Sequence, residues 1–120
     1  LGHVLVIKRG RHPGKGLYAL PGGFLDQMES IQNGCIRELK EETNIDVTKR
    51  ILENSIRDEH VFDHPLRDPR GRTITHAYLF DLDVPRLPVI NAADDASEAV
   101  WIPLQDLESI KIGSSMTTRL

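Results

Sequence analysis

Three glutamates fall within five residues of this chain, at positions 38, 41 and 42. A helix turns about 100° per residue, so Glu41 and Glu42 would lie about 60° and 40° to either side of Glu38, on one stripe. Like charges at this spacing repel by roughly 0.2–0.5 kcal/mol per pair. The stripe is therefore either a solvated face or a set of ligands around a cation. Taken alone, the glutamates favour the solvated face, although Mg²⁺ or Mn²⁺ prefers such oxygen ligands.

A helix over residues 31–43 would position this stripe. Ser30 suits the N-cap, and Asn44 suits the end because asparagine tolerates the left-handed conformation. Arg37 precedes Glu41 by four residues, close enough to orient its carboxylate. Gly34 lies on the same stripe, where a missing side chain leaves space for another group. The adjacent arc, expected to face a sheet, contains Cys35, Ile36, Leu39 and Thr43.

The remaining pattern predicts strands and loops around this helix. Strands are expected at residues 4–8, 17–20, 73–83 and 99–102, with a short helix at 103–110 and an ambiguous segment at 46–59. Loops are expected at residues 9–16, 63–72 and 85–96. This order favours an α/β fold in which helices cover a mixed sheet.

Bulk composition narrows the function classes. The 120 residues form one expected domain, residues 1–120, and the net charge of −3 argues against a nucleic-acid partner. One cysteine, Cys35, excludes an internal disulfide and suggests a cytoplasmic protein. No apolar run approaches the roughly 20 residues that cross a bilayer, so no membrane partner is expected.

The spacing of Gly23, Glu29 and the segment 37–45 resembles the Nudix box, G-x5-E-x7-R-E-U-x-E-E-x-G-U, where U is aliphatic. Every fixed position matches except the penultimate one, where Asn44 replaces glycine. Because asparagine also tolerates positive φ, this departure is mild. So many fixed positions over 23 residues favour a cation site over a solvated face.

The resemblance implies an α/β/α sandwich around a mixed β-sheet and a metal-dependent hydrolase. Members of this family cleave a small nucleotide substrate, a nucleoside diphosphate linked to another moiety, by attack of water on phosphorus. Mg²⁺ or Mn²⁺ would be the cofactor. The implied metal ligands are Glu38, Glu41 and Glu42, with Glu29 in support and the backbone carbonyl of Gly22 or Gly23 completing the set. Arg37 would hold a glutamate in place.

Two further stretches, residues 2–26 and 61–80, resemble the Nudix domain of bifunctional nicotinamide mononucleotide adenylyltransferase/Nudix proteins. In that group the Nudix half is associated with hydrolysis of ADP-ribose to AMP and ribose 5-phosphate. The chain opens at Leu1, inside a strand-like run. We therefore expect a covalent fusion to an N-terminal adenylyltransferase domain. The sequence leaves undecided whether the protein forms a homodimer.

The expected loop at residues 63–72 carries candidate substrate ligands, namely Arg67, Arg70 and Arg72. Their forked donors suit phosphate or ribose oxygens. The alternative is a surface hairpin whose arginines only maintain solubility.

A general base is sought among the acidic residues at positions 91–98, which include Asp94, Asp95 and Glu98. Glu98 is the first choice and Asp95 the second. A solvated acidic loop is an alternative, and Glu41 or Glu42 could instead activate water through the metal.

Two other functions compete with ADP-ribose hydrolysis. The substrate could be another dinucleotide, such as NADH, or a modified nucleoside triphosphate. A non-catalytic module that senses ADP-ribose is the alternative outside the enzymes. The complete set of box carboxylates and the lack of a recognisable DNA-binding motif favour the enzyme.

Overall fold

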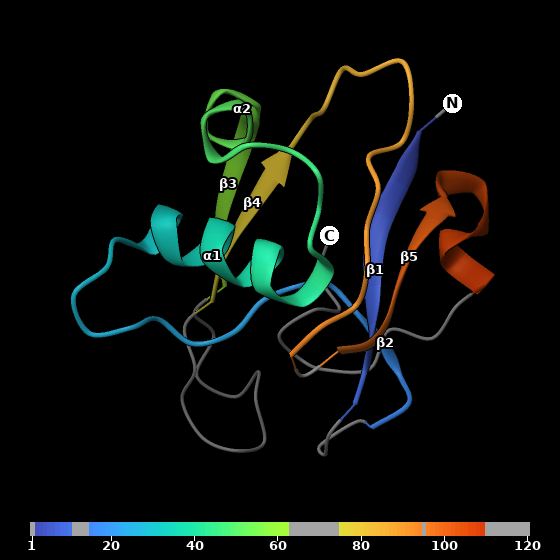
Figure 1. Cartoon of the computed structure of the whole chain (residues 1–120), viewed down its shortest axis with the longest axis horizontal. Helices are drawn as coiled ribbons and strands as arrows, with labels where there is room; N and C mark the ends of the chain where they lie inside the picture. The colour runs from blue at the N-terminus through green and yellow to red at the C-terminus, as the bar shows by residue number, and fades with distance from the viewer. Residues whose placement is uncertain (1, 11–14, 63–74, 95, 110–120) are drawn as a thin grey trace.

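The computed structural model describes residues 2–10, 15–62, 75–94 and 96–109 (Figure 1). Its elements follow one another as β1 (His3–Arg9), β2 (Tyr18–Ala19), α1 (Ile31–Thr43), α2 (Lys49–Asn54), β3 (Ile56–Phe62), β4 (Thr75–Phe80), β5 (Ala96–Pro103) and η1 (Leu104–Ser109). None of the helices in these ranges has the length and apolar character needed to cross a membrane.

The strands form two antiparallel sheets. One has the order β2-β1-β5, with Leu5 opposite Trp101 and Lys8 opposite Glu98, and the other pairs β3 with β4. The expected α/β class is confirmed, and the expected mixed sheet takes the form of two antiparallel sheets within the described ranges. Figure 1 shows α1 running from the β3–β4 pair across to the β1–β5 side.

Helix α1 begins and ends where the sequence predicts. The Ser30 hydroxyl accepts a hydrogen bond from the Asn33 backbone N–H at 3.2 Å, as an N-cap does. Asn44 adopts the left-handed conformation with φ 48°, and its backbone N–H donates to the Lys40 carbonyl. The predicted apolar arc faces inward, because Ile36 and Thr43 are buried.

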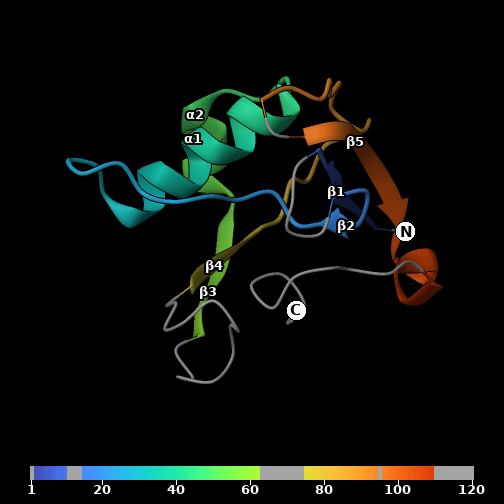
Figure 2. The same ribbon diagram turned by 90° about the horizontal axis from the view of Figure 1, so that it is seen from below.

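The core lies where α1, α2 and both sheets meet. Its buried members are Ile36, Ile45, Val47 and Leu52. Partly buried side chains from β1, β4 and β5 pack against them, and these are Leu5, Phe80 and Trp101. Figure 2 shows α1 and α2 lying together beside the strands. Packing against both sheets fixes the rotation of α1 about its axis, and so fixes the direction of its acidic stripe.

The structure resolves the segments that the sequence pattern left undecided. Residues 46–59 divide into α2, capped by the Thr48 hydroxyl, and β3. Strand β5 begins at Ala96, earlier than predicted, because its pairing with β1 continues to Arg9. The last helix is a short 3₁₀-helix, η1. The predicted loop at residues 63–72 lies outside the described ranges.

Truncating Leu52 tests the position of this core. Its side chain is fully buried (0% exposed), whereas Ile51, its neighbour in α2, is 50% exposed. We expect Leu52→Ala to lower the free energy of unfolding by about 2–5 kcal/mol, since it removes transfer energy and leaves a cavity. Ile51→Ala should cost about 1 kcal/mol or less. Urea denaturation measures both, and equal losses would contradict this assignment of the core.

Candidate active site

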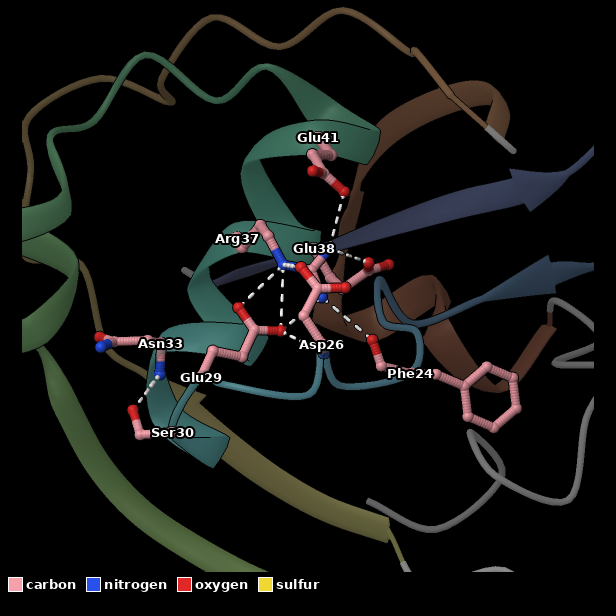
Figure 3. Close-up of polar contacts among 8 residues, drawn as sticks. All are labelled: Phe24, Asp26, Glu29, Ser30, Asn33, Arg37, Glu38 and Glu41. Carbon is pink, nitrogen blue, oxygen red and sulfur yellow. Dashed lines mark hydrogen bonds and ion pairs between the residues drawn. The ribbon is translucent and has the colours of Figure 1, made fainter.

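The Arg37 guanidinium is the centre of the candidate site (Figure 3). Its Nε donates to both carboxylate oxygens of Glu29, at 3.1 and 3.0 Å, and its Nη2 donates to Glu29 Oε1 at 2.6 Å. Its Nη1 donates to Glu38 Oε1 at 2.6 Å and to Glu41 Oε1 at 2.9 Å. One arginine of α1 therefore joins three of the four glutamates that the motif singles out, and its predicted contact with Glu41 is confirmed.

Arg37 also binds the loop that precedes α1. Its Nη2 donates to the Phe24 carbonyl at 3.0 Å, and its Nε lies 3.3 Å from Asp26 Oδ2. The Asp26 backbone N–H in turn donates to Glu29 Oε1 at 2.8 Å. Sequence reasoning missed Asp26, because its contact depends on the path of a loop without a regular pattern. The contacts bring the loop onto the acidic face of the helix.

Loop and helix approach closely at three glycines, and at two of them, Gly23 and Gly34, a side chain would not fit. The Gly22 backbone N–H donates to Glu42 Oε1 at 2.8 Å. A Cβ at Gly23 would collide with the Glu38 carboxylate, and one at Gly34 would collide with Leu25. The space predicted beside Gly34 is thus filled by the chain's own loop.

The three glutamates of the stripe differ in exposure, so they do not form a uniform solvated face. Glu42 is 5% exposed as a residue, and the side chains of Glu38 and Glu41 are 14% and 46% exposed. Burial raises the pKa of Glu38 against the opposing effect of Arg37, and the neighbouring Glu41 and Asp94 carboxylates add to the rise. Hydrogen bonds from Arg37 and from the Asp26 backbone lower the pKa of Glu29.

The donor set fits a hard divalent cation in its chemistry. It offers several carboxylates around one guanidinium, and carboxylate oxygens are the ligands that Mg²⁺ and Mn²⁺ prefer. A nearby cation would also favour the ionised form of Glu38, which burial disfavours. In the described part of the chain, no three acidic, histidine or cysteine side chains already converge as a metal site. Glu29, Glu38 and Glu41 instead direct oxygens toward Arg37.

The candidate bases occupy different surroundings. Glu98 lies on β5 opposite Lys8, and its carboxylate is 3.7 Å from the Lys8 ammonium. Asp94 is close enough to Glu38 for its charge to raise the pKa of that carboxyl. Asp95 lies outside the described residues. The predicted substrate ligands Arg67, Arg70 and Arg72 also lie outside them.

Replacing the carboxylate of Glu29 by a neutral amide should change the free energy of unfolding differently from the same replacement at Glu38. The lowered pKa of Glu29 means that its charge stabilises the fold above its unfolded-state pKa, and this contribution is lost as pH falls. The raised pKa of Glu38 means that its charge opposes folding at neutral pH, and acid relieves this penalty. In chelator, Glu29→Gln should lower the free energy of unfolding at neutral pH, and Glu38→Gln should maintain or raise it.

Urea denaturation from neutral to acidic pH measures this contrast. The deficit of Glu29→Gln should shrink toward acid pH, because the wild-type carboxylate is then protonated. Each variant serves as the isosteric control for the other. Equal losses in both variants at neutral pH would contradict the electrostatic description of the site.

Comparisons with known proteins identify the family to which this chain is similar. The family model described as NUDIX domain matches residues 2–118. The ADP-ribose pyrophosphatase of Methanocaldococcus jannaschii is 38% identical over 108 residues, covering 89% of this chain and 58% of that relative.

Solved structures show the same fold. The bifunctional NMN adenylyltransferase/ADP ribose pyrophosphatase of Francisella tularensis, complexed with AMP and a Mn ion, superposes with a TM-score of 0.90 at 48% identity. The match covers 95% of this chain and 35% of that one. The NUDIX domain of Shewanella oneidensis NrtR, complexed with ADP ribose, gives a TM-score of 0.75 at 28% identity, over 95% of this chain and 70% of that one. With its motif, its fold and the match over nearly its whole length, this chain belongs to the Nudix family.

Proposed function

We propose that this domain hydrolyses ADP-ribose to AMP and ribose 5-phosphate in the presence of Mg²⁺ or Mn²⁺. The observation that carries the proposal is the set of glutamates gathered around Arg37 on a helix fixed by the core. The substrate is supported by the names of the archaeal and Francisella relatives. The chain spans 58% and 35% of the lengths of these two relatives, so we assign their activity to this chain as a proposal.

The reaction adds water across the pyrophosphate. The water oxygen bonds to one phosphorus while the bond from that phosphorus to the bridging oxygen breaks, which leaves two phosphomonoesters. A bound divalent cation would neutralise pyrophosphate charge and lower the pKa of water. The residues proposed to hold it are Glu38, Glu41 and Glu42, supported by Glu29 and the backbone carbonyl of Gly22 or Gly23.

The chain's own contribution is to orient these carboxylates and to accept a proton. Arg37 restricts the positions of Glu29, Glu38 and Glu41 through charge-assisted hydrogen bonds. For the proton acceptor we propose Asp94 over Glu98, because Asp94 follows Ala93, whose backbone N–H donates to the Glu42 carbonyl, whereas Glu98 is paired with Lys8. We further propose that Arg67, Arg70 and Arg72 donate to phosphate or ribose oxygens of the substrate.

Two alternative functions would use the same fold and part of the same site. The complex of the NrtR NUDIX domain with ADP ribose, at 28% identity, supports the alternative of a domain that binds this nucleotide without cleaving it. Another dinucleotide or a modified nucleoside triphosphate would retain the chemistry and change the substrate. Fusion to an adenylyltransferase domain is supported by the bifunctional Francisella protein, and homodimerisation is a separate proposal.

Product analysis of the chain with ADP-ribose, NADH, diadenosine polyphosphates and oxidised nucleoside triphosphates separates these functions. AMP should appear from ADP-ribose with Mg²⁺ or Mn²⁺ and should be absent with chelator. Cleavage of a different substrate would replace the proposed substrate. Binding of ADP-ribose without turnover would favour the sensor.

Glu41→Gln tests the proposed site. We expect turnover of ADP-ribose to fall by about two orders of magnitude or more, because a carboxylate proposed to hold the divalent cation is lost. Stability should change little, since the side chain is 46% exposed and a like-charge cluster is relieved. Glu53→Gln, an exposed position on α2, is the matched control and should leave the rate unchanged. A near wild-type rate in Glu41→Gln would remove Glu41 from the site.

A further inference from the structure

Asn44 is the one position at which this chain departs from the Nudix motif, and its side chain makes a specific contact. Its backbone has φ 48°, a conformation that glycine adopts without steric cost. Its side-chain Nδ2 donates to the carbonyl oxygen of Asn91 at 2.8 Å. Glycine at this position could form the helix cap but could not form this bond.

The Asn44–Asn91 bond lies among backbone hydrogen bonds that join the end of α1 to residues 89–93. Val89 O accepts from Asp46 N at 2.9 Å. Asn91 N donates to Thr43 O at 2.7 Å, and Ala93 N donates to Glu42 O at 3.1 Å. The last carbonyls of a helix have no partner within it, so these two bonds satisfy them. Figures 1 and 2 both show the segment between β4 and β5 passing the C-terminal end of α1.

Asp94 follows directly on this segment. Its φ of 56° makes it, with Asn44, one of two non-glycine residues at positive φ in the described ranges. Asparagine and aspartate are among the few residues other than glycine that adopt this conformation singly. Two backbone hydrogen bonds flank Asp94: Ala93 N donates to Glu42 O, and Ala96 N donates to Ala93 O. The attachment of residues 89–93 to α1 therefore determines where Asp94 stands relative to Glu42 at the end of the helix.

We infer that Asn44 is a positioning residue for catalysis: its side-chain bond to Asn91 holds residues 89–93 against the end of α1 and so places Asp94, which follows Ala93, next to Glu42 at that end. The inference rests on the proposed function, in which Asp94 accepts a proton near the carboxylates of α1. It gives the departure from the motif a role that a glycine cannot fill.

Kinetics of Asn44→Gly and Asn44→Ala, each alone and combined with Asp94→Asn, test this role. One hydrogen bond is removed in both single variants, so kcat should fall about 2- to 10-fold in both, with KM nearly unchanged. In the Asp94→Asn background the same substitutions should cause no further loss. Asn91→Ala is the matched control, because the backbone carbonyl of Asn91 accepts the bond, and it should retain wild-type kcat.

If Asn44 only capped the helix, the activities of the two single variants would differ from each other. Glycine tolerates positive φ and alanine does not, so Asn44→Gly would then behave like wild type and only Asn44→Ala would lose activity in parallel with stability. Wild-type activity in Asn44→Gly with a loss only in Asn44→Ala would overturn the inference. Losses of kcat that add to the loss in Asp94→Asn would overturn it as well.

Amide hydrogen exchange measured by NMR provides a readout that needs no turnover. The Asn91 and Ala93 amides, which donate to α1 carbonyls, should exchange about 2- to 10-fold faster in both Asn44 variants. Wild-type exchange at both amides in Asn44→Gly would overturn the inference. If the wild-type chain cleaves no substrate, the proposed function fails, and the exchange rates still decide whether Asn44 holds this segment.

Discussion

The ion pairs between Arg37 and its glutamates are the interaction on which the candidate site depends. Without the Arg37 guanidinium between them, the carboxylates of Glu38 and Glu41 on α1 and of Glu29 in the preceding loop would repel one another. A guanidinium suits this position because its planar fork can donate to several oxygens at once. The same group binds the Phe24 carbonyl, so helix and preceding loop share one fixed point.

Arg37 can hold the glutamates in one orientation only because core packing prevents α1 from rotating about its axis. Ile36 and Thr43 are buried on the arc of α1 beside the acidic stripe, and the core that contains Ile36 reaches β1, β4 and β5. Apolar packing therefore sets the direction of the charges, while Arg37 sets their mutual positions. The pKa values of Glu29 and Glu38 move in opposite directions because hydrogen bonds dominate at the first carboxylate and burial dominates at the second.

Local signals made much of α1 predictable. Ser30 and Asn44 mark its ends through interactions within a few residues, and the 3.6-residue period placed the acidic stripe beside the apolar arc. Contacts that depend on tertiary structure were not predictable. The loop carrying Asp26 folds back onto Arg37, and a bond across 47 residues joins Asn44 to Asn91. The place of Asp94 at the end of α1, and the pairing of Glu98 with Lys8, depend likewise on how separate segments meet.

If the acidic face of α1 binds a divalent cation and is not merely solvated, its carboxylates should set the affinity of the chain for Mn²⁺. Titration with Mn²⁺, followed by electron paramagnetic resonance in the absence of substrate, measures this affinity. We expect a Mn²⁺ site whose affinity falls at least about tenfold, or about 1.4 kcal/mol, in the Glu38→Gln/Glu41→Gln double variant. Equal Mn²⁺ affinity in the double variant and the wild-type chain would show that these carboxylates do not bind the cation.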